Sequence, residues 1–246
     1  MIKRELYMNR IRPFIGGELI KVMTGIRRSG KSVMLELIKE ELAEAGVAPS
    51  QMISINFEDM RYSHLQTATA LHDEIIKRAE GIEGKAYLFF DEIQEVEGWE
   101  KCVNSLRVAL DCDIYITGSN AKLLSGELAT YIGGRYVEFV IYPFSFAEFL
   151  ELYHTIAPSD SIQQCFQKYL LAGGMPYLAN LRYEEEPSRQ YLTDLFNSVQ
   201  LKDIVKRNKI RDIDLLERII AYMTANVGTV FSASSLAKFF KNEQRT

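Results

Sequence analysis

Apolar residues in the first 143 positions recur in two alternating patterns, one typical of strands and one typical of helices. Runs that predict strands occupy residues 20–24, 52–57, 86–90, 114–117 and 136–141. Between them, apolar residues at helical spacing predict helices over residues 31–45, 71–81 and 103–110. Strands that alternate with helices build a parallel sheet covered by helices. The pattern therefore predicts an α/β fold for residues 1–143.

Beyond residue 143 the strand pattern stops and the chain becomes helical. Two S-x-x-E/Q patterns, beginning at Ser145 and Ser161, predict helix starts, because the serine and the acid or amide of such a capping box satisfy free backbone N–H groups. Apolar stripes predict two further helices over residues 192–199 and 215–223. We therefore expect a helical lid domain over residues 144–226.

The last part of the chain, residues 227–246, has a serine-rich stretch that leads into an apolar helix at residues 231–240. This order resembles the start of a winged helix, and the helix that would enter a DNA groove is missing from it. We expect a partial winged helix in a truncated chain, with DNA as a partner of the complete winged helix. The alternative is a small helical cap with a disordered tail.

Composition narrows the class of protein. The 246 residues are 47% hydrophobic and 25% charged, as in ordinary globular proteins, and no uncharged stretch is long enough to span a membrane. The net charge of −4 gives no general attraction to nucleic acids, so DNA binding would need a local patch. Three scattered cysteines resemble neither a disulfide framework nor a zinc site, and no signal peptide is recognisable. We expect a cytoplasmic protein.

A glycine-rich segment directly after the first predicted strand matches G-x-x-x-x-G-K-[ST] in full. It reads Gly25-Ile26-Arg27-Arg28-Ser29-Gly30-Lys31-Ser32. Its backbone N–H groups and the following helix start would form a cradle for phosphates. Lys31 would reach the β and γ phosphates, and Ser32 would ligate Mg²⁺. A simple turn with a solvated lysine is the alternative, but the segment stands between a strand and a helix, where a phosphate loop must stand.

Residues 25–33 are together the candidate contacts for the nucleotide, with Val33 as the last of them. Arg27 and Arg28 belong to this set as binding residues only, because charged side chains in such loops commonly face water.

Two carboxylates, Asp91 and Glu92, directly follow the apolar run at residues 86–90. Open α/β sheets bind ligands at this end of their strands. Asp91 is expected to hold Mg²⁺ through its water shell, and Glu92 to polarise a water for attack on the γ phosphate. Alone, two such acids usually form a solvated turn. The strand near residues 53–57 lies between the two motifs, which favours the phosphate-loop branch that has an inserted strand and a catalytic glutamate.

Several runs together resemble the AAA+-like ATPases of bacteria and archaea that carry a C-terminal domain of unknown function. These runs are residues 25–32, 55–59, 89–94, 116–120, 133–135, 172–176 and 201–205. The resemblance covers nearly the whole chain. It implies ATP binding and ATP hydrolysis.

The resemblance also implies roles for residues near two later strands. AAA+ proteins place a polar sensor after the strand at residues 114–117, where Ser119 and Asn120 stand; we take Asn120 as catalytic, and a polar turn is the alternative. Arg135 resembles the arginine that stabilises transition-state charge, often from a neighbouring subunit of a homo-oligomer. Action within the same subunit and a plain surface charge both stay open.

The N-terminal segment would lie near the adenine in the resembling family, and the alternative is a helix packed on the sheet. Its apolar residues are Tyr7, Met8, Ile11 and Phe14. The three histidines lack metal-ligand spacing and are expected to be structural or exposed; they are His64, His72 and His154.

These observations predict a P-loop ATPase that uses ATP and Mg²⁺. ATP is preferred to GTP by resemblance, and no Asn-Lys-x-Asp run that would read guanine is present. The main alternative is a nucleotide-gated, DNA-associated regulatory switch with little turnover. A small-molecule kinase is a second alternative, because it shares the loop but needs an acceptor pocket.

Overall fold

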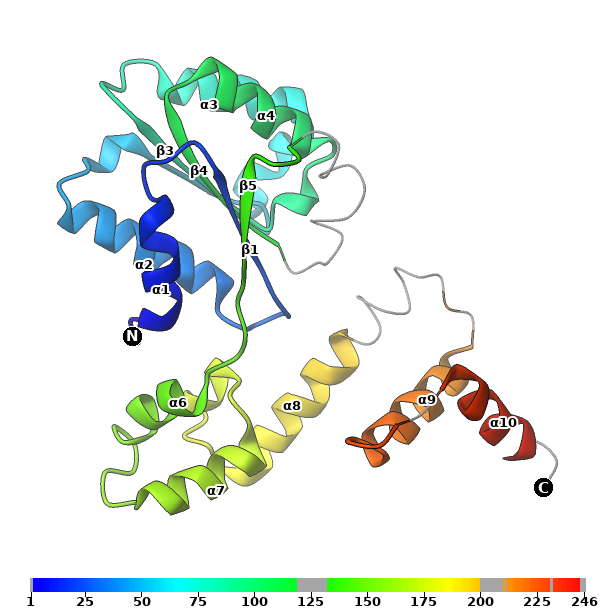
Figure 1. The fold of residues 1–246 in the computed structure, drawn as a ribbon. Coiled ribbons are helices and arrows are strands. Elements are labelled where there is room, and N and C mark those ends of the chain that lie inside the picture. Colours follow the sequence, from blue (N-terminus) through cyan, green and yellow to red (C-terminus); the bar gives the residue numbers. More distant parts are fainter. Residues whose placement is uncertain (1, 119–131, 200–209, 211, 231, 244–246) are drawn as a thin grey trace. The chain divides into compact units, whose positions relative to one another are not determined.

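The computed structural model describes residues 2–118, 132–199, 210, 212–230 and 232–243 (Figure 1). Within them, the N-terminal part forms a five-stranded sheet. The strands are β1 (Ile20–Thr24), β2 (Met52–Asn56), β3 (Ala86–Asp91), β4 (Cys112–Thr117) and β5 (Tyr136–Val140). All neighbouring strands are parallel, in the spatial order β2-β3-β4-β1-β5. The predicted parallel sheet is confirmed, and each predicted strand is present to within two residues.

The strand order refines the prediction of an inserted strand. β2 follows β1 in the sequence but lies at the edge of the sheet, beside β3. The strand that separates β1 from β3 in space is β4. Because neighbouring strands lie about 4.8 Å apart, the ends of β1 and β3 are roughly 10 Å apart, and the end of β4 lies between them.

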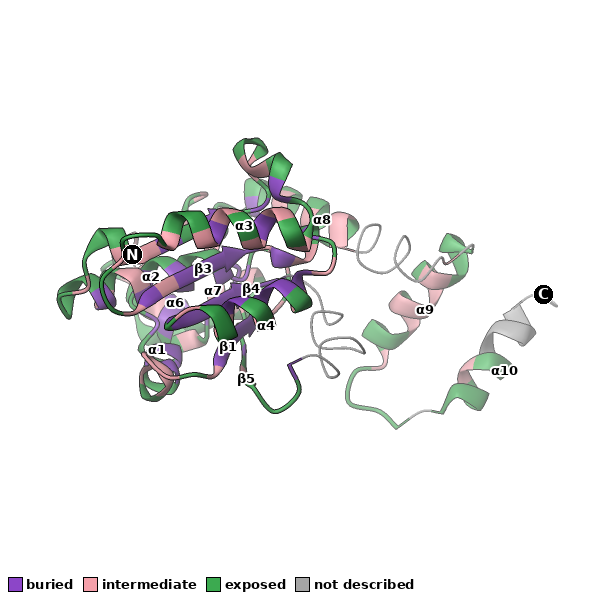
Figure 2. Ribbon diagram, turned by 90° about the horizontal axis from the view of Figure 1, so that it is seen from above, coloured by how far each residue is buried: buried purple, intermediate pink, exposed green. Residues whose placement is uncertain are grey.

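Helices cover both faces of the sheet (Figure 1). They are α1 (Glu5–Ile11), α2 (Lys31–Glu44), α3 (Ala68–Ala79) and α4 (Trp99–Ala109). One core joins the sheet to α1 and α2, and the other joins it to α3 and α4. Figure 2 shows buried strands between helices whose outer sides are exposed. Tyr7, Met8 and Ile11 belong to the first core, as expected for a helix packed on the sheet.

A fully buried ion pair lies near the amino ends of the strands. The Lys21 ammonium on β1 pairs with the Asp113 carboxylate on β4. The Tyr115 hydroxyl and the Gly16 N–H donate to Asp113 at 2.7 and 2.6 Å, and Lys21 also donates to the Gly17 carbonyl at 3.0 Å. Burial lowers the pKa of Lys21, against the opposing effect of Asp113. Because each charged group has several partners, the pair is a structural element of the core.

The helical region after the sheet contains α6 (Phe146–Tyr153), α7 (Ile162–Ala172) and α8 (Glu185–Val199). Both predicted capping boxes are present and begin α6 and α7 at Ser145 and Ser161. A cluster of aromatic rings forms the core of this region. Its members are Phe146, Phe149, Tyr153, Phe166, Tyr169 and Tyr183.

The chain divides into two compact units, Met1–Thr193 and Asp194–Thr246. The predicted boundary near residue 143 lies inside the first unit. The second unit contains α9 (Ile213–Ala225) and α10 (Ala233–Glu243), which correspond to the last two predicted helices. A partial winged helix over residues 227–246 stays a prediction. In the described parts of the chain, no helix combines the length and apolar character that crossing a membrane requires.

Candidate functional site

The loop at residues 25–32, called the 25–32 loop below, connects β1 directly to α2, as the sequence predicts. Gly25 has a φ of 142°, and a Cβ there would lie 2.2 Å from the Ile141 carbonyl oxygen. Gly30 has a φ of 99° and stands at the start of α2. Both positions therefore require a positive φ, which residues other than glycine adopt only with strain. Gly25 also lets the segment after β5 pass close to the loop.

Replacing Gly25 by alanine is expected to destabilise the protein by roughly 3 kcal/mol or more, because strain at positive φ adds to a clash with backbone. Gly46→Ala is the matched control. Its φ is 92°, but a Cβ there meets no atom within 4 Å, so only the strain of about 1–2 kcal/mol applies. Urea unfolding measures both. Equal losses would contradict the close contact at Gly25.

Lys31 is the first residue of α2 and is 4% exposed. Its ammonium donates to the carbonyl oxygens of Gly25 and Ile26 at 3.2 and 3.1 Å. The same nitrogen lies 3.9 Å from the Glu92 Oε1. The lysine therefore lies over its own loop and faces the acids that follow β3.

Asp91, at the end of β3, is buried and receives hydrogen bonds from both neighbouring strands. The Thr117 hydroxyl at the end of β4 donates to Oδ1, and the Asn56 amide at the end of β2 donates to Oδ2 at 3.1 Å. Burial raises the pKa of Asp91, while hydrogen bonds from Thr117 and then Ser32 oppose this. Ser32 and Asp91, the two predicted Mg²⁺ residues, are therefore together in the folded chain.

Glu92 has a left-handed backbone with φ 55° and ψ 48°. Its N–H donates to the Thr117 hydroxyl at 3.0 Å, and its Oε2 accepts a hydrogen bond from the Gln94 amide. Its side chain is 14% exposed. Strained residues of this kind persist where surrounding contacts hold them, and they concentrate at functional sites. The contacts hold the carboxylate beside Lys31.

Three residues of this site were not given a role by the sequence analysis: Asn56, Thr117 and Gln94. Asn56 and Thr117 end the two strands that flank β3, so their side chains meet Asp91 only in the folded sheet. The signal available in the sequence is that polar residues end three predicted parallel strands, which places them at one edge. Gln94 lies two residues after Glu92, within reach of its carboxylate.

A family model described as an AAA domain matches residues 18–150, more than half of the chain. The chain belongs to the AAA domain family. A second model, described as a domain of unknown function (DUF8612), matches residues 163–246. The predicted membership of AAA+-like P-loop ATPases with a C-terminal domain of unknown function is thus confirmed.

The AAA-domain chain is similar to longer proteins without a described function. It is 38% identical over 245 residues to an uncharacterised protein of Haemophilus influenzae, covering 99% of this chain and 60% of that one. It is 32% identical over 236 residues to an uncharacterised protein of Methanocaldococcus jannaschii, covering 91% of this chain and 51% of that one. The chain therefore spans between half and two thirds of the length of these curated relatives.

Solved structures resemble the AAA-domain chain at low sequence identity. AMPPCP-bound DnaA from Aquifex aeolicus is 14% identical, with a TM-score of 0.49 and coverage of 94% of this chain and 71% of that one. A RuvB mutant of Thermotoga maritima is 15% identical, with a TM-score of 0.47 and coverage of 88% and 75%. At these identities the likeness concerns the fold alone.

Arg135 lies at the amino ends of the strands, whereas the 25–32 loop lies at their carboxyl ends. It directly precedes β5, and its carbonyl oxygen accepts a hydrogen bond from the N–H of Ile20, the first residue of β1. The loop begins five residues later, roughly 16 Å along the strand. Arg135 is exposed and donates to Asn104 Oδ1 at 3.1 Å. Action on a nucleotide at the loop of the same subunit is therefore ruled out, and action on a neighbouring subunit stays a prediction.

Two predicted site residues lie outside the described part of the AAA-domain chain. Ser119 and Asn120 belong to residues 119–131, so their sensor role stays a prediction.

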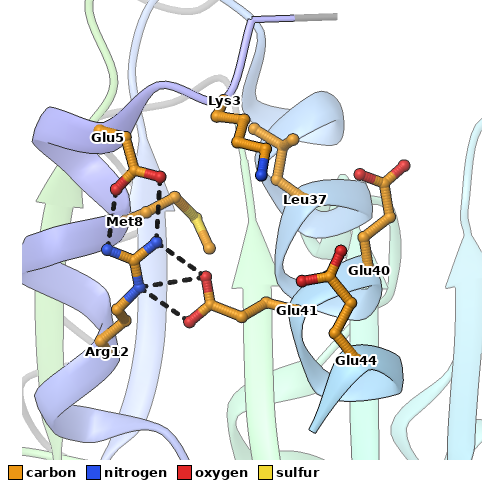
Figure 3. Close-up of a pocket in the computed structure, with 8 residues that line it drawn as sticks. All are labelled: Lys3, Glu5, Met8, Arg12, Leu37, Glu40, Glu41 and Glu44. Carbon is orange, nitrogen blue, oxygen red and sulfur yellow. Dashed lines mark hydrogen bonds and ion pairs between the residues drawn. The ribbon is translucent and has the colours of Figure 1, made fainter.

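A pocket of about 270 Å³ lies between α1 and α2 (Figure 3). It is lined by Lys3, Glu5, Met8, Arg12, Leu37, Glu40, Glu41 and Glu44. Arg12 bridges Glu5 and Glu41 at 2.8 and 2.9 Å, so it fastens α1 to α2. With four carboxylates against two cations, the lining repels phosphates, and none of its residues belongs to the 25–32 loop.

Other reactive side chains in the described residues do not form a second site. No group of three or more histidine, cysteine or acidic side chains there could hold a metal ion. Cys102, Cys112 and Cys165 are buried free thiols. Burial raises the pKa of Cys102 to about 12 and that of Cys112 to about 11, so both stay protonated and unreactive at neutral pH.

Proposed function

We propose that this AAA-domain chain binds ATP with Mg²⁺ at the 25–32 loop and hydrolyses it. The observation that carries the proposal is the meeting of two motifs that lie far apart in the sequence. The ammonium of Lys31 is 3.9 Å from the carboxylate of Glu92. A loop with a helix start, a buried cation and adjacent carboxylates is the arrangement that phosphoryl transfer to water requires.

We assign nucleotide binding to residues 25–33. Backbone N–H groups of the loop and the start of α2 would cradle the phosphates, and Lys31 would exchange its loop carbonyl partners for the β and γ phosphate oxygens. The arrangement offers oxygen ligands of the kind that Mg²⁺ prefers, the Ser32 hydroxyl and the Asp91 carboxylate. Burial raises the pKa of Asp91, and a bound cation would compensate for that burial. When bound, Mg²⁺ would neutralise part of the negative charge of the phosphates.

Hydrolysis needs a base beside the γ phosphate, and we assign Glu92 to it. Its carboxylate would take a proton from the attacking water while Lys31 stabilises the charge on the phosphate. Gln94 and Thr117 hold the carboxylate and the backbone of Glu92, so the base is oriented before the substrate arrives. Asn120 is proposed to contact the attacking water or the γ phosphate.

Phosphate release from Mg·ATP tests the proposal and separates it from its alternatives. The assay contains no acceptor molecule, and it is run with and without duplex DNA and with GTP in place of ATP. Steady release without an acceptor supports an ATPase and opposes a small-molecule kinase. Tight binding with negligible turnover under every condition would favour the nucleotide-gated switch. Turnover only with DNA would indicate a DNA-stimulated ATPase.

Arg135→Ala is expected to lower turnover by about a hundredfold or more while leaving ATP affinity within about twofold, because a transition-state arginine acts mainly on the rate. Since Arg135 cannot reach the loop of its own chain, the proposal requires a homo-oligomer. Mixing Arg135→Ala protein with Lys31→Ala protein should partly restore turnover, because one interface then combines an intact loop with an intact arginine. Normal turnover of Arg135→Ala would leave the residue as a surface charge that bonds Asn104.

A further inference from the structure

Arg4 lies just before α1 and contacts three separate parts of the first unit. It is 2% exposed, although arginine is rarely buried. Its guanidinium donates to the Ser29 carbonyl at 2.9 Å, to the Tyr142 carbonyl at 2.8 Å and to the Glu148 carboxylate at 2.8 Å. The rings of Tyr7 and Phe144 lie 4.6 and 5.2 Å from it. The side chain thus joins the 25–32 loop to the helical region.

The contact with Ser29 fixes more than one carbonyl group. In a planar trans peptide the C=O and the following N–H point in opposite directions. Holding the Ser29 oxygen therefore also fixes the direction of the Gly30 N–H, one of the donors of the phosphate cradle. Gly30 has a φ of 99°, and glycine accepts either orientation of this peptide at little cost. The loop sequence alone does not prevent the peptide from turning over, and the bond from Arg4 opposes it.

Glu148 holds the guanidinium in this position. Its Oε1 and Oε2 accept from Arg4 at 2.8 and 3.4 Å, and Oε2 also accepts from the Ser145 N–H at 2.8 Å in the capping box of α6. Burial alone would raise the pKa of Glu148, but the hydrogen bonds from Arg4 and Ser145 outweigh it and the pKa lies below its usual value. The carboxylate is therefore charged at neutral pH, as a partner of arginine must be.

We infer that Arg4 is a positioning residue that orients the Ser29–Gly30 peptide for phosphate binding, and that Glu148 of α6 keeps Arg4 in place. The inference rests on the proposed function, because it assigns a role toward a bound nucleotide. It makes the phosphate affinity of the loop depend on a helix outside the sheet.

Arg4→Lys tests the inference, because lysine keeps the charge but cannot bridge three acceptors as the planar guanidinium does. The control is Asp113→Asn, which disrupts the buried ion pair with Lys21. The hydrogen bonds of Lys21 and Asp113 link them to each other, to Tyr115 and to Gly16 and Gly17 before β1, near the amino ends of the strands. Both variants should lose stability, so all binding is measured at a temperature where each is folded. Calorimetry with Mg²⁺ and a non-hydrolysable ATP analogue gives the affinity.

Arg4→Lys is expected to weaken the affinity about tenfold, the effect of one lost hydrogen bond of about 1.4 kcal/mol, whereas Asp113→Asn stays within about twofold of the wild type. A second measurement needs no nucleotide. In protein labelled with ¹⁵N-glycine, the Gly30 amide should shift and exchange faster in Arg4→Lys and not in Asp113→Asn.

An unchanged affinity together with an unchanged Gly30 amide in Arg4→Lys overturns the inference. If the wild type binds no nucleotide, the proposed function fails, and the Gly30 amide alone then decides whether Arg4 orients the peptide. If Arg4→Lys does not fold, Glu148→Gln replaces it, because the amide keeps the shape of the partner and removes its charge. The same two readouts apply, and a wild-type result in both again overturns the inference.

Discussion

Replacing Lys31 by alanine is expected to weaken binding of Mg·ATP by about thirtyfold or more, because hydrogen bonds to charged groups contribute about 2 kcal/mol or more. Two effects act together. The substitution removes the cation that faces the β and γ phosphates. It also removes a positive charge that lies 3.9 Å from Glu92 and acts on the buried Asp91, so the site repels the phosphates more strongly.

Calorimetry on Lys31→Ala measures the loss of affinity, and Lys39→Ala is its matched control. Lys39 lies on the same helix, two turns further on, and forms an exposed pair with Glu36 at 2.7 Å. An exposed pair contributes little, so the control should bind as the wild type does. Equal affinity of Lys31→Ala and the wild type would remove the phosphate-loop assignment, whatever the activity of the protein.

The sequence is sufficient for those parts of the fold that depend on local pattern. Strands appear where apolar runs occur, and the capping boxes at Ser145 and Ser161 begin α6 and α7, because their hydrogen bonds join residues three apart. The strand order is less accessible. Nothing in the residues near 53–57 indicates that β2 lies at the edge while β4 enters between β1 and β3.

The residues of the candidate site also differ in whether the sequence predicts them. Residues 25–32, Asp91 and Glu92 are recognisable because each motif is continuous in the sequence. Thr117 and Asn56 contact Asp91 only because β4 and β2 flank β3 in register. Arg4 and Glu148 are 144 residues apart, and neither lies in a motif that predicts the other. Contacts of this kind follow from the packing of a whole unit.

Arg135 illustrates a different limit of sequence reasoning. Two glycines and an arginine before a strand suggest a catalytic arginine, but they do not indicate how far this arginine lies from the 25–32 loop. The pairing of Ile20 with Tyr136 decides this, because it places Arg135 beside the start of β1. Because the 25–32 loop lies at the other end of β1, Arg135 cannot reach the loop of its own subunit. The proposed role therefore requires the loop of a neighbouring subunit.

Glu92→Gln is expected to lower turnover by about a hundredfold or more, the usual contribution of a general base, while keeping Mg·ATP affinity at or above that of the wild type. An amide cannot accept the proton of the attacking water. It can keep the contact with Gln94, whose buried Oε1 has no hydrogen-bond partner among the described residues and can accept from the new amide. Removing a negative charge near the phosphates favours binding.

Glu95→Gln is the control, because this exposed acid lies three residues further on and has the same change of charge. Phosphate release gives the turnover, and calorimetry gives the affinity separately. A loss of turnover with retained affinity in Glu92→Gln alone supports the base assignment, since only the step after binding has changed. Turnover equal to that of the wild type would show that another group activates the water. A parallel loss of affinity and turnover would instead mean that Glu92 acts by holding Lys31 in the loop.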